Sequence, residues 1–499
     1  MVEMLAKEGN MKVPVAMFIT DKVQPSTETF ERLRDLASIE GVSENIVALP
    51  DIHFKHSNSA PTGIVVVSEH FIIPKIISTD CGMCLFTTNL TTKDVTPQLL
   101  DTLFGAFQKS ISVNIRKKPI ISAEALDALL LEGPSYLYKK FSMDTKELQN
   151  IEYEGNLLKG FNISIEELRN LLPKEAFVLG RNSLGILGTG NHFLELQSVV
   201  EEPDPALAKI FGLKKNQLVF MLHCDSSGFG NAIHDYYKEY KNGKFGMSLK
   251  RNLLYKAYLN FGKIPGGKTF LYHMNIQRKH LKEHLSWKQG SAKQNFVTVP
   301  IESEAGQEYL KTKYVAMMYG FSNRAYVRKL VQDCLTKTFS KKIETHLLVD
   351  STHDSFYYEE IKGKMLCVHR NGANRVLPKT LFKKHPLFSK TGQPLLVPGS
   401  MGSASYFCVP LKGVESTFYS VYHGAGRVLE KAEARDTISM KKFQEEMQHV
   451  RLYRYGVGDI VEEAPSSFKD VTAVLEAMEY HQLAKPVVKL KPLAFLKGS

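Results

Sequence analysis

Long apolar runs and closely spaced cysteines are both scarce in this chain of 499 residues. The most apolar stretch, residues 63–77, is interrupted by charged residues and a proline, so no segment reaches the length that spans a bilayer. The charged N-terminal residues are not typical of a signal peptide. Of the six cysteines, only Cys81 and Cys84 lie close together. A chain of this size does not need disulfide bonds, so we expect a reducing, cytoplasmic setting and no membrane partner.

Internal repeats, low-complexity tracts and clear linkers are also absent. Apolar residues make up 43% and charged residues 23%, as in a folded, water-soluble protein. The length alone allows about two or three domains, but without a linker we expect one large domain over residues 1–499. The formal net charge of +12 favours a polyanionic ligand such as nucleic acid.

One stretch, at about residues 235–296, is rich in lysine, arginine and tyrosine and poor in acids. Cations neutralise phosphates and aromatic rings stack on unpaired bases, so this insertion in the domain is typical of a nucleic-acid surface. The alternative is a solvated, helix-rich insertion whose lysines only keep it soluble. Either interpretation accounts for the composition.

Hydrophobic periodicity predicts a mixture of helices and strands. Helices are expected over residues 28–38, 97–109, 123–139, 438–452 and 468–482, the last with Ser467 as its N-cap and Asp470 in its first turn. Strands are expected over 46–49, 64–67, 76–77, 218–222, 347–349 and 395–397. Several of these strands run directly into polar, glycine-containing turns. Polar residues at the ends of buried strands indicate a site at the edge of a sheet.

Five short polar motifs carry potential metal ligands or nucleophiles. They are Asp80-Cys81-Gly82, Gly190-Asn191-His192 with Glu195, His223-Cys224-Asp225-Ser226, Asp350-Ser351-Thr352-His353, and His423-Gly424-Ala425-Gly426-Arg427. Thiol, imidazole and carboxylate groups together suit divalent ions such as Zn, Mn or Fe. A fold that gathers such distant pieces usually builds one active site, so the sequence indicates a metalloenzyme.

Each of these residues also has a simpler interpretation. Cys81 can be a small buried residue, or half of a zinc site with Cys84, although no second cysteine pair completes it. His192 can belong to a capping turn. Either His223 or His353 alone is more typical of a structural histidine than of a ligand. Two histidines after apolar runs, together with Cys81 and His192, favour metal binding.

The His423 motif has the composition of a nucleophile turn. Its glycines open space around the imidazole and free backbone N–H groups for phosphate oxygens, while Arg427 can neutralise charge. Histidine attacks phosphorus once a neighbouring group fixes its tautomer. The turn that contains Ser400 is similar and can bind a nucleobase or a phosphate. Neither turn matches a Walker A loop or a dinucleotide fingerprint.

Taken together, the motifs resemble the RtcB family of GTP-dependent RNA ligases. The matching segments are residues 50–53, 188–195, 368–373, 392–406, 423–427, 463–470 and 490–498, in the family's order. The resemblance implies an α+β fold, a single large mixed α/β domain with a metal pocket between sheets. It also implies an enzyme that joins RNA ends bearing a 3′-phosphate or 2′,3′-cyclic phosphate to 5′-hydroxyl ends, in RNA repair or tRNA splicing. The resemblance implies GTP as co-substrate and two Mn²⁺ ions as cofactors. It also suggests an archease-like activator as a further partner.

The resemblance assigns a role to each motif. His423 would attack the α-phosphate of GTP and carry GMP. Metal ligands would be Cys81, Asp80, His192, His223 and His353. GTP would contact Asn191, Glu195, Ser400, His423, Gly424, Ala425, Gly426, Phe468 and Lys497. RNA phosphates would contact Arg427 and Lys431.

Three departures from the family pattern stand out. The family reads Asp-x-x-Cys where this chain has Asp80 directly before Cys81, and Ser-Arg-Gly where this chain has Ser-Ser-Gly at 226–228. A family Ser-Arg pair is replaced by Glu430-Lys431, which exchanges a bidentate donor for a point charge. A fourth, smaller departure is that Phe468 stands where the family often has tyrosine. These changes describe a divergent paralogue with altered RNA-end selection. The alternatives are a metal-dependent RNA-end phosphoesterase and a catalytically idle RNA-binding relative.

Overall fold

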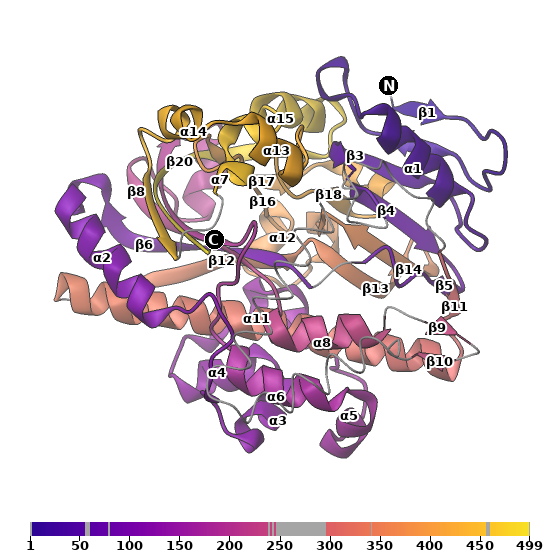
Figure 1. Ribbon diagram of the computed structural model, residues 1–499, viewed down its shortest axis with the longest axis horizontal. Helices are drawn as coiled ribbons and strands as arrows, with labels where there is room; N and C mark the ends of the chain where they lie inside the picture. Colours follow the sequence, from indigo (N-terminus) through magenta and orange to yellow (C-terminus); the bar gives the residue numbers. More distant parts are fainter. Residues whose placement is uncertain are drawn as a thin grey trace.

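A computed structural model describes residues 2–54, 60–77, 80–237, 240–241, 244–245, 296–340, 342–455 and 460–498. Two β-sheets organise these residues (Figure 1). The first has six strands in the order β1-β2-β3-β4-β14-β13. Their bounds are Glu3–Leu5 (β1), Val15–Met17 (β2), Ile46–His53 (β3), Thr62–Ser68 (β4), Lys364–Asn371 (β14) and Asp354–Ile361 (β13).

The second sheet has eight strands, with β12-β6-β8-β7-β20-β17-β16 in line and β19 paired to β20. Their bounds are Thr345–Thr352 (β12), Gly82–Thr91 (β6), Gln217–Cys224 (β8), Phe193–Glu201 (β7), Ala484–Gly498 (β20), Ser405–Pro410 (β17), Leu395–Val397 (β16) and Arg451–Tyr455 (β19). Three short ribbons complete the strands: Phe71–Ile72 (β5) with Val299–Pro300 (β11), Tyr240–Lys241 (β9) with Lys244–Phe245 (β10), and Ala373–Arg375 (β15) with Ser420–Tyr422 (β18).

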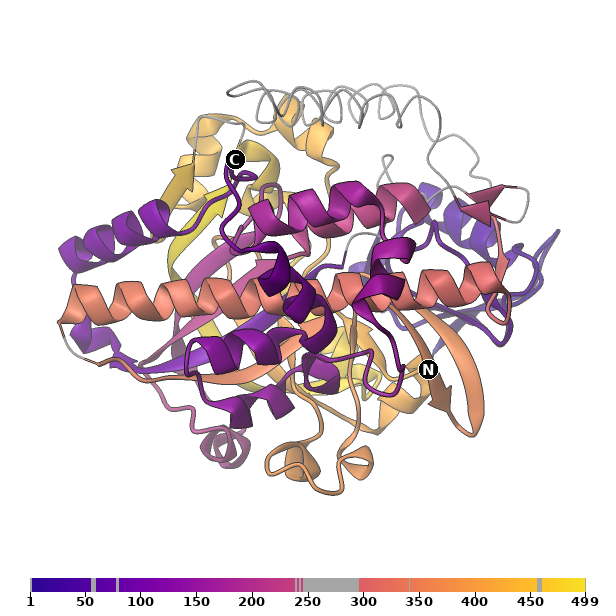
Figure 2. The ribbon, with the colours of Figure 1, turned by 90° about the horizontal axis from the view of Figure 1, so that it is seen from below.

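The helices pack around these sheets (Figures 1 and 2). They are Thr27–Ala37 (α1), Pro97–Ser110 (α2), Ala123–Glu132 (α3), Pro134–Lys140 (α4), Ile165–Leu171 (α5), Lys174–Ser183 (α6), Pro205–Ile210 (α7), Ser227–Tyr237 (α8), Glu304–Phe339 (α11), Phe388–Thr391 (α12), Lys431–Thr437 (α13), Met440–Glu446 (α14) and Val471–Tyr480 (α15). Within the described ranges, no helix combines the length and the hydropathy of a membrane span.

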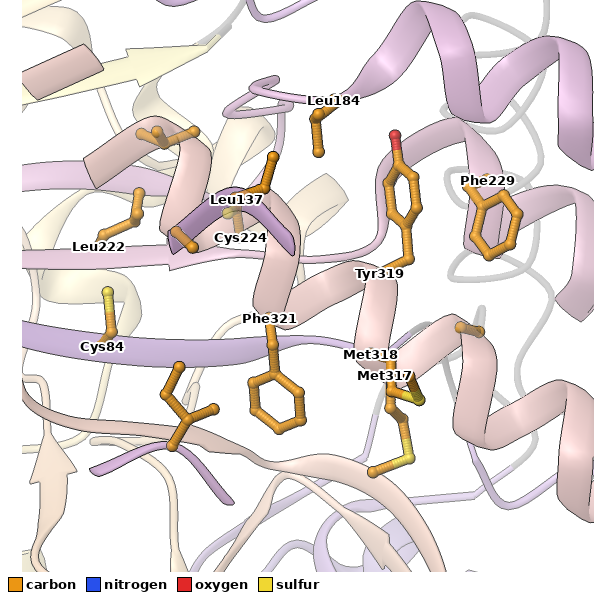
Figure 3. Close-up of a cluster of buried hydrophobic side chains, with 14 of the residues drawn as sticks. Cys84, Leu137, Leu184, Leu222, Cys224, Phe229, Met317, Met318, Tyr319 and Phe321 are labelled. Carbon is orange, nitrogen blue, oxygen red and sulfur yellow. The ribbon is translucent and has the colours of Figure 1, made fainter. Parts of the chain in front are cut away.

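The long helix α11 forms the centre of the largest apolar core. It begins at Ser303, whose hydroxyl accepts a hydrogen bond from the Gly306 amide. Strands of the second sheet lie on one side of α11 and helices α3 to α6 on the other, so its side chains are buried nearly all round (Figure 1). Figure 3 shows part of this core, where Tyr319 stacks on Phe229 with ring centroids 4.5 Å apart. The Tyr319 hydroxyl donates to the carbonyl of Gly180, which ties α11 to α6.

The structure confirms the predicted mixture of strands and helices as a single large α/β fold. Helices at 28–38 and 97–109 and strands at 46–49, 64–67, 218–222, 347–349 and 395–397 all lie where periodicity placed them, within a few residues. The predicted insertion at 235–296 falls almost wholly outside the described residues.

Three predicted helices are wrong in part, and one predicted strand is absent from the described residues. The helix at 123–139 is broken in two at Gly133, where φ is +63° and a proline follows. The apolar pair at 76–77 belongs to a turn closed by the Ile76 amide on the Ile73 carbonyl. The helix predicted at 438–452 stops at Glu446, and residues 451–455 instead form β19, which pairs with β20. The last helix has Asp470, not Ser467, as its N-cap.

Candidate active site

Four candidate metal ligands meet at one edge of the second sheet. Cys81 directly precedes β6 and His192 directly precedes β7, while His223 lies near the end of β8 and His353 directly follows β12. In the sheet β12 pairs with β6, β6 with β8 and β8 with β7, all antiparallel. Antiparallel neighbours place the start of one strand beside the end of the next, so the four side chains are brought to the same edge.

The distances within this group suit a shared ion. The Sγ of Cys81 lies 3.1 Å from Nε2 of His223 and 3.4 Å from Nε2 of His192. Nε2 of His223 is 3.2 Å from Nε2 of His353. Ligands of one tetrahedral ion with bonds of about 2.1–2.3 Å lie about 3.6 Å apart, close to these separations. Cys81, His223 and His353 therefore have the identities and the spacing of a metal-binding group.

Hydrogen bonding and burial prepare the imidazoles for ligation. The Nδ1–H of His223 donates to the backbone oxygen of Asn191, 3.0 Å away, which leaves the lone pair on Nε2. Burial lowers the pKa of both His223 and His353 well below the ordinary value, so both rings are neutral near pH 7. Burial raises the pKa of Cys81, and a bound cation would offset this by stabilising the thiolate. The group therefore fits one divalent ion.

Asp80 lies outside this group, contrary to the expectation that it ligates metal. One of its carboxylate oxygens is 2.5 Å from Nζ of Lys313, and the other accepts a hydrogen bond from the Ser226 hydroxyl at 3.1 Å. Both neighbours are buried with it, so the carboxylate is already partnered. Among the described residues, no other cluster of three or more Cys, His, Asp or Glu side chains has metal-binding spacing. Cys81 and His192 could coordinate a second ion here, but the Asp80 carboxylate would not contribute to its coordination.

His423 reaches the same place from the short ribbon of β15 and β18. It directly follows β18, and its ring stacks on His353 with centroids 4.7 Å apart. Its Nδ1 is 2.9 Å from a carboxylate oxygen of Asp51 and 2.9 Å from the carbonyl oxygen of Gly372. Both partners can only accept, so Nδ1 carries the proton and Nε2 keeps the lone pair. The side chain is 17% exposed, so it is accessible to a substrate.

Two glycines allow this close packing around His423. Gly372 has φ of +67°, and a Cβ there would overlap Thr62 and lie 3.1 Å from the His423 ring. Gly426 has φ of +73°, and a Cβ there would overlap the backbone oxygen of Asp51. The chain on either side of Asp51 is also held by Lys469, whose Nζ donates to the carbonyls of Pro50 and Ile52. Asp51 is therefore fixed from two sides against the imidazole.

A buried ionic cluster lies next to the His423 turn and carries a surplus of positive charge. Its basic members are Arg427, Lys431, Arg435 and Lys497, and its acidic members are Glu462 and Glu463. Four cations against two carboxylates leave a net charge of about +2. Burial favours the neutral acid, but Lys431, Lys497 and Arg427 outweigh it and hold the pKa of Glu463 below its ordinary value. An anionic ligand would complete the charge balance of this cluster.

The other residues predicted to contact nucleotide surround the same space. The turn that bears Ser400 meets the His423 turn, because the Ala425 amide donates to the carbonyl of Pro398. A Cβ on Gly190, next to the exposed Asn191, would lie 3.7 Å from Nζ of Lys431. Arg427 makes a cation–π contact with Phe468, in which the guanidinium carbon lies 4.6 Å from the centroid of the ring.

Glu195 is the one carboxyl among the residues predicted to contact nucleotide. It lies in β7 opposite Phe495 and is almost fully buried. Burial raises its pKa to about 8, against smaller opposing effects of Gln197 and Lys497. The side chain is therefore protonated near pH 7 and can both donate and accept a hydrogen bond.

The sequence did not predict the buried residues of α11 that support the candidate metal ligands. Arg324 of α11 is fully buried, and its guanidinium donates to the Asp350 carboxylate at 2.6 Å and to the Cys224 carbonyl at 2.9 Å. Asn323 bridges the carbonyls of Ile186 and Asp225. These contacts fix the loops that carry His192 and His223. Asp51 lies in the matching segment 50–53, but nothing in the sequence linked it to His423.

Comparison with known proteins agrees with this arrangement. A family model described as tRNA-splicing ligase RtcB matches residues 32–498. The chain is 28% identical to the tRNA-splicing ligase RtcB of Methanococcus maripaludis, over 98% of this chain and 95% of that protein. The tRNA-splicing ligase RtcB of Archaeoglobus fulgidus is also 28% identical, with the same coverage of both chains.

A third relative is longer. The tRNA-splicing ligase RtcB of Pyrococcus horikoshii is 28% identical over 94% of this chain, and the chain spans about half (50%) of its length. The match to the family thus extends from the first helix to the end of β20 and includes all five polar motifs. This chain belongs to the RtcB family.

Proposed function

We propose that this chain is an RNA ligase that joins a 3′-phosphate or 2′,3′-cyclic phosphate RNA end to a 5′-hydroxyl end, with GTP as co-substrate. The observation that carries the proposal is His423, whose Nδ1 is held by Asp51 and Gly372 and whose ring stacks on the metal-ligand candidate His353. A nucleophilic imidazole beside a metal group is suited to phosphoryl transfer. Relatives named as tRNA-splicing ligases support tRNA splicing as the setting.

The metal group would be Cys81, His223 and His353, with His192 and Cys81 offered to a second ion. A bound Mn²⁺ would act as a Lewis acid on phosphoryl oxygens and align the reacting ends. The thiolate and imidazoles also accept Zn²⁺, so the ion is identified by metal analysis of the purified protein.

The nucleotide would lie between the His423 turn and the cationic cluster. The surplus charge of Arg427, Lys431 and Lys497 supports binding of a triphosphate. Protonated Glu195 can donate to O6 of guanine and accept from the adjacent N1–H. The backbone amides of the turn from Gly424 to Gly426 are available to phosphate oxygens.

The chemistry then follows from the state of His423. Its Nε2 lone pair forms a bond to the α-phosphorus of GTP, and the bond to pyrophosphate breaks. The Asp51 carboxylate stabilises the positive charge that develops on the ring. The RNA 3′-phosphate displaces the histidine and takes up GMP. The 5′-hydroxyl then attacks that activated phosphate and GMP leaves.

Joining of defined RNA ends tests this proposal. The purified protein is incubated with Mn²⁺, GTP and two RNAs, one with a 3′-phosphate and one with a 5′-hydroxyl. We expect a joined product that requires GTP and is lost in His423→Ala. A matched pair with 3′-hydroxyl and 5′-phosphate ends should not be joined. Cleavage or dephosphorylation without joining would contradict the proposal and favour a phosphoesterase.

A further inference from the structure

A hollow of about 420 Å³ opens between the end of α2 and β19. Its wall is formed by residues 108–114 together with Arg116 and Tyr455. Among the described residues that line it none is acidic, whereas Lys109 and Arg116 contribute positive charge. Ligand pockets commonly measure about 300–1,000 Å³, so the space can take a nucleotide-sized group. The lining favours an anion.

Arg116 is the main source of this preference. It is half-buried, and its guanidinium donates to the carbonyls of Leu184 at 2.6 Å and Gly185 at 3.2 Å. Burial lowers its pKa, and among the described residues only tyrosine hydroxyls oppose this effect, with no carboxylate nearby. Carbonyls orient the guanidinium but do not neutralise it. A phosphate in the hollow would supply the missing negative charge.

Exposed cations extend the same positive surface. Lys109 ends α2 on the solvent side, and Lys117 and Lys118 follow Arg116 and are also exposed. Exposed lysines attract a phosphate backbone by charge, without reading its sequence. The hollow with its rim is therefore suited to a nucleic-acid strand more than to a single small anion.

Two backbone connections join the hollow to the active site. On one side Ser112 bridges to Ile186, and the Leu187 amide donates to the Ser112 carbonyl at 2.8 Å, just before the loop that carries His192. On the other side β19 pairs with β20, and Tyr455 lies opposite Gly498. The segment after α2 passes beside the C-terminus in both views (Figures 1 and 2). A strand in the hollow would thus lie next to the segments bearing His192 and Lys497.

We propose that this hollow binds a backbone phosphate of single-stranded RNA, adjacent to the end that is joined. This inference rests on the proposed ligase function, because it assigns the RNA to the same site. Arg116 would pair with one phosphodiester and Lys109 with its neighbour. The bases would have no specific readout here, so binding would depend on salt more than on sequence.

The test measures RNA binding without turnover. A fluorescent single-stranded RNA with a 3′-phosphate is titrated with the full chain and Mn²⁺, without GTP, and anisotropy is recorded at several salt concentrations. The variants are Lys109→Glu and Arg116→Gln, since glutamine keeps a donor for the neighbouring carbonyls. Lys379→Glu is the matched control, because Lys379 is an exposed lysine that does not line the hollow. Covalent transfer of labelled GMP from GTP to the protein, which needs no RNA, is measured for the wild-type protein and for every variant.

We expect each hollow variant to bind RNA about 5–10-fold more weakly, with a salt slope lower by about one unit, while labelling by GTP is unchanged. The control should differ from the wild-type protein by less than about 2-fold. Should Arg116→Gln not fold, Lys109→Glu decides, because its side chain is exposed. If the hollow variants bind RNA as tightly as the Lys379→Glu control, the inference is wrong, and a protein becomes the alternative ligand of the hollow. A wild-type protein that is not labelled by GTP would instead contradict the ligase proposal, and the RNA titration would still decide the hollow.

Discussion

Asn in place of Asp51 tests how the nucleophile is prepared. In the structure Nδ1 of His423 faces two acceptors at equal distance, the Asp51 carboxylate and the Gly372 carbonyl, each at 2.9 Å. Asp51→Asn removes the charged acceptor and leaves the neutral one. A charge-assisted hydrogen bond contributes about 1.5–3 kcal/mol, against about 1 kcal/mol for a neutral one. The loss also includes the stabilisation of charge on the ring in the transition state.

We therefore expect labelling by GTP to slow by about 10–100-fold, which corresponds to about 1.4–2.8 kcal/mol. Complete loss is not expected, because the Gly372 carbonyl still holds the proton on Nδ1. The assay is single-turnover transfer of α-labelled GTP to the protein, with metal content measured in parallel. Asp470→Asn is the control, since Asp470 is an exposed N-cap where asparagine serves equally well. An unchanged rate in Asp51→Asn with normal metal content would refute the positioning role of Asp51.

Three further predictions concern the metal, the buried ion pair and the buried acid. Cys81→Ser should lower bound metal by more than about 10-fold after dialysis, measured by elemental analysis, and full retention would remove Cys81 from the ligand set. Lys313→Met should lower the free energy of unfolding in urea by about 3–5 kcal/mol, because it leaves Asp80 buried without its cation. The double variant Lys313→Met with Asp80→Asn should recover most of that loss. An unaltered unfolding midpoint in the single variant would contradict the ion pair. Glu195 has its pKa raised to about 8, so between its ordinary pKa near 4.5 and 8 the folded chain holds a proton that the unfolded chain has lost. The stability of the wild-type protein relative to Glu195→Gln should therefore fall by about 1.4 kcal/mol per pH unit in that window and level off above it. Thermal unfolding of both proteins across this pH range measures the difference. Parallel pH profiles would show that the carboxyl is not protonated.

The metal-ligand edge was largely predictable from sequence because its pattern is local. His223 and His353 follow apolar runs that were predicted as strands and that form β8 and β12, whereas Cys81 precedes β6, which was not predicted. Strand ends in an antiparallel sheet meet at shared edges, so the side chains converge once the strands pair. The position of a residue relative to its strand therefore carried most of the information.

Contacts between distant segments were not predictable in the same way. Asp51 and His423 are separated by 372 positions and belong to β3 and the turn after β18. Lys313 and Arg324 lie on α11, where burial on all sides removes the amphipathic contrast that identifies a helix. Nothing local marks Lys313 as the partner that holds Asp80. The sequence motif and the resemblance both suggested Asp80 as a metal ligand, whereas in the folded chain its carboxylate pairs with the ammonium group of Lys313.

The proposed ligase reaction requires that GMP becomes covalently bound to His423. The most direct measurement is to incubate the purified chain with α-labelled GTP and Mn²⁺, denature and digest it, and locate the label by mass spectrometry. We expect an acid-labile GMP adduct on His423 that forms with GTP and not with ATP, and that is absent from His423→Ala while its metal content stays normal. Label on another residue, or no label on a protein that holds its metal, would contradict it.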